Sequence, residues 1–282
     1  MQRNIQVITA FTFTLIIYGY APDLGATSNC PLIEDETARA CCERSLPEHS
    51  MRQTITMAVI DDKGTVSNLS AEFYWKRFDD KRARARIELT NPPRQSGTVV
   101  LLTESETEQD GAPREPEVVL YKPGERRDRL ISISALSGEM FGTDFSYDDF
   151  AHFYGTDANV NVVRLEDVEL DGKTHIVLQT TAKDQGAAYD RGSIYSRVLT
   201  YLDVVQCVPT LTRFYDEDNK LRKELIATAD QIRLVEDRWI PHELTMYDLV
   251  EESKTVLTVE SIEFDTGIND RMFSRSLLKR GR

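Results

Sequence analysis

The sequence predicts a mainly β protein with few helices, organised as one large, curved antiparallel sheet or barrel. From residue 51 onward, apolar and polar residues alternate in many stretches with the period of two that is typical of strands. About a dozen such stretches follow one another, separated by turn signals rich in Gly, Asn, Asp and Pro. Few helical patterns interrupt them, which favours sequential hairpins over a doubly wound parallel sheet.

Residues 1–28 predict a secretory signal peptide. Arg3 provides a positively charged start, and the apolar stretch Val7–Tyr20 is too short to span a bilayer comfortably. Ala26 and Ser28 then place small residues at the positions that a signal peptidase reads. The alternatives are a signal anchor that stays uncut, or a buried strand.

The composition fits one globular domain over residues 29–282. The chain has 282 residues, of which 40% are hydrophobic and 29% charged, and its formal net charge is -13. All-β barrels and sandwiches of ~200–250 residues commonly form a single unit. An acidic surface repels nucleic acid and anionic membranes, so neither is expected as a direct partner.

The cysteines predict disulfides. An exported chain with the four cysteines Cys30, Cys41, Cys42 and Cys207 allows three pairings. The adjacent pair Cys41 and Cys42 would be strained if bonded to itself. We expect one of the two to join Cys207 and the other to join Cys30, which would tie the N-terminal segment to the body. A zinc site is not supported, because Cys and His do not occur as spaced pairs.

A helix is expected first, at Asp35–Pro47, where Ala and Cys recur at helical spacing and Pro47 ends the run. Strands of the first half are then predicted at residues 51–60, 65–78, 81–89, 96–104, 117–123 and 129–134. Two of these, at 96–104 and 117–123, carry successive apolar residues, which predicts burial on both faces. The polar segment Glu106–Pro116 is expected to be a long exposed loop.

Strands and hairpins of the second half are predicted at residues 159–182, 193–205, 207–229, 231–250 and 254–265. Asp171–Gly172 is the expected turn of the first hairpin. In the last strand, Leu257 and Val259 share one parity and Phe264 the other, which predicts a β-bulge. A short amphipathic helix is expected at Asn269–Leu278.

The segment Met140–Gly155 concentrates six aromatic residues and three aspartates. Ser146 and Asp149 have the spacing of a capping box, and Phe145 and Phe150 that of a hydrophobic staple. The aspartates therefore have a local role in starting a helix and need no catalytic role.

That helix carries an aromatic stripe formed by Tyr147, Phe150, Ala151 and Tyr154, and Gly155 is a suitable end. A helix of about two turns must bury this stripe against another element. The alternatives are a plug that packs into the core and a lid over an apolar cavity.

Motifs of catalysis are absent from the sequence. It has no G-x-S-x-G, H-E-x-x-H or G-x-G-x-x-G, and its acidic runs lack the glycine and terminal glutamate of a calcium loop. No enzymatic activity, metal or cofactor is therefore expected. The basic residues Lys122, Arg126, Arg127 and Arg129 indicate a solvated turn or, alternatively, a docking patch for an acidic partner.

Two blocks carry a family resemblance: VVLYKPGERRDRLISIS at Val118–Ser134 and MFGTDFSYDDF at Met140–Phe150. Together with the closing hairpins they resemble the exported outer-membrane lipoprotein-sorting-like proteins, relatives of the carriers LolA and LolB, over roughly Thr90–Arg280. The loop at Glu106–Pro116 and the set of cysteines depart from that family's pattern.

The resemblance implies an unclosed antiparallel β-barrel capped by short helices. It further implies a periplasmic, non-enzymatic carrier of lipoprotein acyl chains or another hydrophobic ligand, with an inner-membrane transporter or an outer-membrane acceptor as partner. We expect the ligand to be contacted by aromatic residues of the segment Met140–Gly155 and of the strand predicted at 117–123. These are Tyr121, Phe141, Phe145, Tyr147, Phe150 and Tyr154.

Two other functions are carried as alternatives. The first is an envelope protein without catalytic activity, whose interior is filled by side chains and which docks on a membrane transporter. The second, more distant, is a hydrolase.

Overall fold

The computed structural model describes residues 33–80, 82–104, 117–125, 127–132, 135–149, 160–182 and 195–278. The predicted signal peptide, the loop at 106–116 and Cys30 lie outside these ranges, as do the predicted site residues Phe150 and Tyr154.

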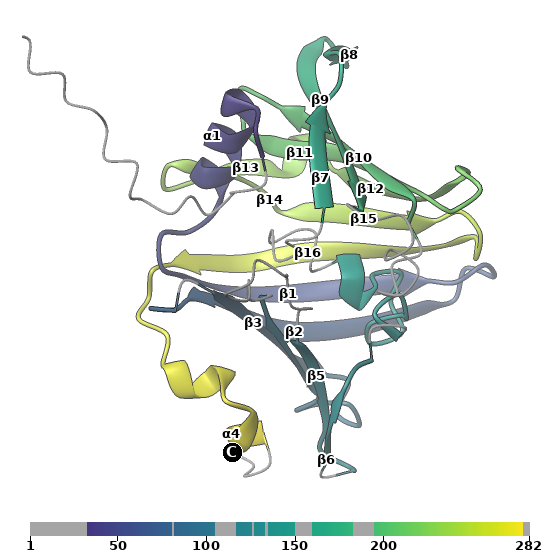
Figure 1. Ribbon diagram of the computed structural model, residues 1–282. Coiled ribbons are helices and arrows are strands. Elements are labelled where there is room, and N and C mark those ends of the chain that lie inside the picture. The colour runs from purple at the N-terminus through teal and green to yellow at the C-terminus, as the bar shows by residue number, and fades with distance from the viewer. Residues whose placement is uncertain are drawn as a thin grey trace, which may run out of the picture.

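One antiparallel sheet of 14 strands dominates the structure and confirms the predicted fold class (Figure 1). Along the sheet the order is β6-β5-β4-β3-β2-β1-β16-β15-β12-β11-β10-β9-β7, and β8 also pairs with β9. The sheet curves strongly but does not close, because β6 and β7 form its two ends and do not pair with each other.

The strands of the first half are β1 (Ser50–Ile60), β2 (Val66–Arg77), β3 (Ala83–Asn91), β4 (Val99–Thr103), β5 (Glu117–Lys122) and β6 (Arg127–Leu130). Those of the second half are β7 (Val160–Arg164), β8 (Val168–Leu170), β9 (Lys173–Ala182), β10 (Arg197–Asp203), β11 (Val208–Tyr215), β12 (Leu221–Ala227), β15 (Glu243–Asp248) and β16 (Ser253–Phe264). A separate hairpin is made by β13 (Ile232–Val235) and β14 (Arg238–Pro241).

The central pair of the sheet joins the first strand of the chain to the last. In the antiparallel register of β1 and β16, Thr54 pairs with Ser261 and Ile55 with Val259. Glu260 is therefore the extra residue of a β-bulge, as the parity change in the sequence predicts. The predicted turn at Asp171–Gly172 is also confirmed, with both residues at positive φ between β8 and β9.

Strands β4 and β5 are covered on both faces, as their successive apolar residues predict. Val100 and Leu102 of β4 belong to the main core on the concave face of the sheet. Val99 and Leu101 point to the opposite face, where they pack with Leu278 of helix α4 (Arg275–Leu278). With the 3-10 turn η3 (Asp270–Phe273), α4 occupies the helical region predicted near the C-terminus.

Two predicted boundaries differ from the structure. The strand expected at 129–134 is β6, which ends at Leu130. The hairpin expected at 231–250 is divided: β13 and β14 pair only with each other, and β15 returns to the main sheet. Pro241 closes β14 because proline has no N–H to donate to a longer ladder.

Helix α1 (Glu36–Ser45) matches the predicted N-terminal helix and lies beside β14 at one end of the sheet (Figure 1). Its N-cap is Asp35, whose carboxylate accepts a hydrogen bond from the Ala38 amide at 2.9 Å. The same carboxylate accepts a 2.8 Å hydrogen bond from Arg164 of β7. This contact is the largest of the effects that lower the pKa of Asp35.

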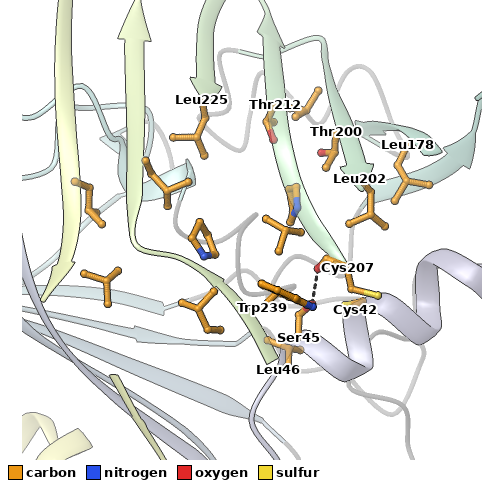
Figure 2. Close-up of a pocket in the computed structure, with 18 of the residues that line it drawn as sticks. Cys42, Ser45, Leu46, Leu178, Thr200, Leu202, Cys207, Thr212, Leu225 and Trp239 are labelled. Carbon is orange, nitrogen blue, oxygen red and sulfur yellow. Dashed lines mark hydrogen bonds between the residues drawn. The ribbon is translucent and has the colours of Figure 1, made fainter. Parts of the chain in front are cut away.

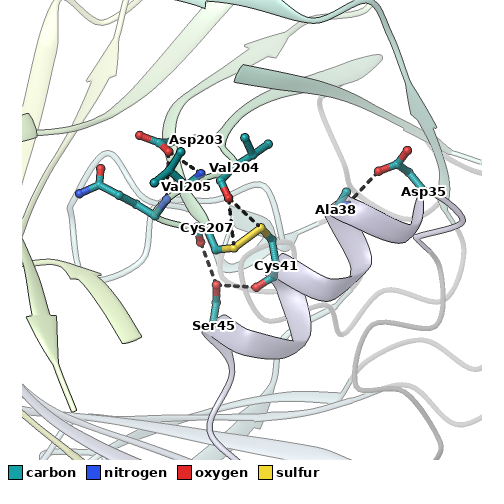
Figure 3. The surroundings of a disulfide bond; sticks show 9 residues. Asp35, Ala38, Cys41, Ser45, Asp203, Val204, Val205 and Cys207 are labelled. Carbon is teal, nitrogen blue, oxygen red and sulfur yellow. Dashed lines mark hydrogen bonds between the residues drawn. A yellow bond between two sulfur atoms is a disulfide. The ribbon is translucent and has the colours of Figure 1, made fainter. Parts of the chain in front are cut away.

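A disulfide between Cys41 and Cys207 fastens α1 to the start of β11 (Figure 3). The hydroxyl of Ser45 donates to the carbonyls of Cys41 and Cys207, each at 2.8 Å, and so strengthens the same junction. Cys42 is also disulfide-bonded. Thus one of the two adjacent cysteines joins Cys207, as predicted, while the pairing with Cys30 stays a prediction.

Removing the disulfide is expected to destabilise the whole fold. The bond closes a loop between positions 166 residues apart, and loss of such a constraint costs about 2–5 kcal/mol in the free energy of unfolding. The double variant Cys41→Ala/Cys207→Ala, compared with the wild type by urea unfolding followed by tryptophan fluorescence, should show a loss of this size. As a control, Ser45→Ala removes only hydrogen bonds and should cost about 1 kcal/mol. Equal unfolding free energies of the double variant and the wild type would contradict the expectation.

Candidate functional site

The concave face of the sheet encloses an apolar cavity of about 410 Å³. Strands β1, β16 and β9 to β12 form its walls, while α1 and β14 lie along one side (Figure 2). None of its lining side chains among the described residues is an Asp, Glu, Lys, Arg or His. The cavity is therefore suited to an uncharged, mainly hydrophobic molecule, and its volume lies in the range of roughly 300–1,000 Å³ of ordinary ligand sites.

Side chains point alternately to the two faces of a strand, and this explains why the residues that line the cavity come together. In β10, Val198, Thr200 and Leu202 point to the cavity, whereas the intervening residues point to the outer surface. In the neighbouring β11, Thr212 and Phe214 do the same. Each strand of the curved sheet thus contributes every second side chain to one concave surface.

The side near α1 is built from the helix, the residues that follow it and the β13–β14 hairpin. Ala38, Cys42 and Ser45 of α1 and Leu46 line the cavity, together with Trp239 of β14. Cys207 lines it as well, so the disulfide lies at the margin of the cavity (Figures 2 and 3). The position of α1 over the cavity is consequently fixed by a covalent bond.

The capping segment 135–149 contributes Phe145, which is 1% exposed and lines the same cavity. The capping box after it is present: the Ser146 amide donates to the Asp149 carboxylate at 2.7 Å, and the Asp149 amide donates to the Ser146 hydroxyl at 3.0 Å. The predicted local role of Asp149 in starting a helical turn is confirmed.

The aspartates of this segment also have a second role, which depends on contacts with distant strands. The carboxylate of Asp144 accepts hydrogen bonds from Ser253 and, at 2.5 Å, from Thr255 of β16. The ammonium group of Lys223 on β12 donates to the Asp144 carbonyl at 2.7 Å and lies 3.8 Å from the Asp149 carboxylate. These contacts fasten the capping segment to the sheet.

Lys223 is 4% exposed and also lies 3.9 Å from the carboxylate of Asp248. Its side chain points inward with those of Leu225 and Ala227, the apolar residues of the same parity on β12. The burial of Lys223 could be predicted from the sequence, because Lys223 has the same parity as the inward-facing apolar residues of its strand. A lysine at such a position is buried and requires a buried partner.

Burial raises the pKa of the Asp149 carboxyl, and the neighbouring Lys223 ammonium offsets only part of this effect. Asp149 is 0% exposed, so its negative charge has lost the solvation it has in the unfolded chain. Keeping the Asp149 carboxylate ionised in the folded capping turn therefore costs free energy.

The predicted ligand-contacting residues do not form one group. Phe145 lines the cavity, and Tyr147 is buried in the adjoining core, where burial raises the pKa of its hydroxyl. Phe141, at a φ of 60°, packs half-buried against that core. Tyr121 lies on the opposite face of the sheet with Leu278, because it alternates with Val118, which points inward. The structure does not place Tyr121 in this cavity.

Most of the lining residues were not singled out from the sequence. They come from α1, β9 to β12, β14 and β16, where they look like ordinary inward-facing strand residues. Within the part of the chain that the structure describes, no group of three or more His, Cys, Asp or Glu side chains could hold a metal ion. The described helices are all too short or too polar to cross a bilayer.

The fold resembles that of three solved structures. A domain from Vibrio parahaemolyticus named for outer membrane lipoprotein sorting has a TM-score of 0.73 and 21% identity, covering 87% of this chain and 97% of that domain. A DUF1329 family protein from Desulfovibrio piger has a TM-score of 0.75 and 20% identity, covering 86% and 96%. A LolA superfamily protein from Nitrosomonas europaea has a TM-score of 0.64 and 14% identity, covering 86% and 97%.

The family itself is shown by the sequence. A family model described as "Uncharacterized protein" matches residues 81–280, and the chain belongs to this family. No curated protein matches the sequence.

The buried carboxyl of Asp149 predicts a specific dependence of stability on pH. Because its pKa is raised on folding, the folded state binds a proton more readily than the unfolded state. Its stabilising contribution is complete below the unfolded pKa of about 4 and is lost as pH rises through the folded pKa. In Asp149→Asn this loss should be absent, while the amide oxygen can still accept the hydrogen bond from Ser146.

The measurement is the free energy of unfolding of the wild type and of Asp149→Asn at a series of pH values from 4 to 8. The difference, variant minus wild type, should become more positive as pH rises. The same substitution at an exposed turn position, Asp218→Asn, is the control. A difference for Asp149→Asn that stays constant or shrinks with pH would refute the assignment.

Proposed function

We propose that this protein is a non-enzymatic carrier for the acyl chains of a lipidated protein, or for another hydrophobic ligand, in outer-membrane lipoprotein sorting or lipid transport. The observation that carries the proposal is the cavity of about 410 Å³, whose lining side chains in the described ranges are all uncharged. Burying an acyl chain gains roughly 0.8 kcal/mol for each methylene removed from water. A ligand with such a chain needs this kind of shelter to cross an aqueous compartment.

The proposed function also implies a cellular compartment and partner proteins. The LolA-like fold and the predicted signal peptide support a periplasmic protein that exchanges its cargo with an inner-membrane transporter or an outer-membrane acceptor. The Vibrio parahaemolyticus domain, which is named for lipoprotein sorting, has the same fold over nearly its whole length. This agreement in fold supports the class of cargo and leaves its identity to experiment.

The alternative of a docking protein with a filled interior is less well supported. It requires core side chains to occupy the concave side of the sheet, and the cavity between α1 and the sheet is space that they leave open. The basic turn proposed for docking is also partly neutralised, since Arg129 pairs with Glu125.

Filling part of the cavity should weaken ligand binding. Val162 of β7 lines the cavity and is only half-buried, so Val162→Trp can place its indole in the cavity without disturbing the main core. Excluding two or more methylenes of a ligand should weaken its binding about tenfold or more. The matched control is Val163→Trp on the other face of the same strand, where Val163 is 53% exposed.

The measurements are titration of each purified protein with a fluorescent fatty acyl probe and native mass spectrometry of protein taken from the periplasm. The carrier predicts probe binding and a co-purifying lipid in the wild type and in Val163→Trp, and about tenfold weaker probe binding with less co-purifying lipid in Val162→Trp. A clean mass and no probe binding in the wild type would refute the carrier and favour the docking protein. Hydrolysis of an acyl ester, lost on one Ser or His substitution, would instead support the hydrolase.

A further inference from the structure

Two threonines lie side by side in the wall of the apolar cavity. Thr200 of β10 and Thr212 of β11 are direct cross-strand partners, and both line the cavity. The next positions outward in the same row are Leu178 of β9 and Leu225 of β12. Across four strands the row therefore runs Leu, Thr, Thr, Leu (Figure 2).

No hydrogen bond joins either threonine hydroxyl to another described residue. Thr212 is 5% exposed and Thr200 is half-buried, and both side chains line the cavity. Neither hydroxyl oxygen belongs to the fully buried polar atoms that lack a partner, so a molecule in the cavity can reach both. The pair is thus an accessible polar site within an apolar surface.

Two other polar side chains of the cavity are already engaged. The Ser45 hydroxyl donates to two backbone carbonyls, and the Gln53 amide nitrogen contacts the Met51 sulfur at 3.3 Å. Thr180 of β9, which is paired with Val198 next to Thr200, adds a third unpartnered hydroxyl at the edge of the same site.

Among the described residues, no counter-ion for a charged ligand group lines this position. The cavity has no charged lining side chain in the described ranges. Lys223, two residues from Leu225 on the same face of β12, is occupied by the Asp144 carbonyl and by the carboxylates of Asp149 and Asp248. Moving a carboxylate or phosphate into such surroundings is strongly unfavourable.

We propose that Thr200 and Thr212 form a polar subsite that binds the ester or other uncharged carbonyl group of an acyl ligand, while its hydrocarbon chain contacts the surrounding apolar wall. This inference rests on the proposed carrier function and deepens it. Each hydroxyl can donate to a carbonyl oxygen, which has two lone pairs and so can accept from both threonines. The subsite selects neutral esters over hydrocarbons, which leave both hydroxyls unpaired, and over carboxylates, which bring an uncompensated charge.

The test compares three probes of matched length, namely methyl dodecanoate, the dodecanoate anion and a straight-chain hydrocarbon, each displacing a fluorescent acyl probe from the full-length purified protein at pH 8. In the variant Thr200→Val/Thr212→Val, each side chain keeps its branched shape and loses only the hydroxyl. The ester should bind about tenfold more weakly to this variant than to the wild type, and the hydrocarbon at least as tightly as before. Thr258→Val, on the outer face of β16, is the control and should change neither.

The possible results distinguish a failure of the proposed subsite from a failure of the proposed carrier function. If the wild type binds none of the probes, the proposed carrier function fails and the subsite with it. If the wild type binds ester and hydrocarbon but the double variant binds both unchanged, the carrier stands and the subsite is overturned. The subsite is also overturned if the double variant loses the hydrocarbon as well, or if the wild type binds dodecanoate more tightly than its methyl ester.

Discussion

The antiparallel pairing of β1 with β16 is the contact on which the rest of the structure depends. It brings the first and last strands of the chain into the middle of the sheet, so that the two halves extend from it in opposite directions. The bulge at Glu260 shifts the parity of β16 along this pair. Bulges bend a strand and increase its twist, which contributes to the strong curvature of the sheet. Without that curvature the inner surface would be flat, and no cavity could form between it and α1.

The concave surface is divided into two parts that are held by different forces. Around the cavity, apolar side chains face a space they do not fill, and a disulfide keeps α1 beside it. Lys223 of β12 contacts the Asp144 carbonyl and the Asp149 carboxylate, and Thr255 of β16 donates to the Asp144 carboxylate, so the capping segment is held against both strands. A buried ion cluster needs defined geometry to compensate its desolvation, so the second part is held by directional polar contacts and the first by apolar packing and a covalent bond.

The fold was largely accessible from the sequence, because strand alternation and turn residues act locally. The bulge in β16 could be predicted from the parities of Val259 and Phe264, and the capping box from the spacing of Ser146 and Asp149. The site was less accessible. Phe145 lines the cavity, whereas Tyr121 lies on the opposite face of the sheet, since an apolar run such as that of β5 does not reveal which parity points inward. Lys223 and the Thr200–Thr212 pair depend on register between strands, which a single sequence specifies only through the fold.

The open edges of the sheet affect whether the protein self-associates at high concentration. A sheet that does not close leaves two edge strands, β6 and β7, whose backbone groups could pair with those of another molecule. Three of the four residues of β6 are charged, and β7 ends in Arg164, which is engaged with Asp35 and Asp167. Charged side chains on an edge strand are one of the features by which proteins discourage such pairing. The same openness that creates an interior for cargo thus requires that the margins resist self-association.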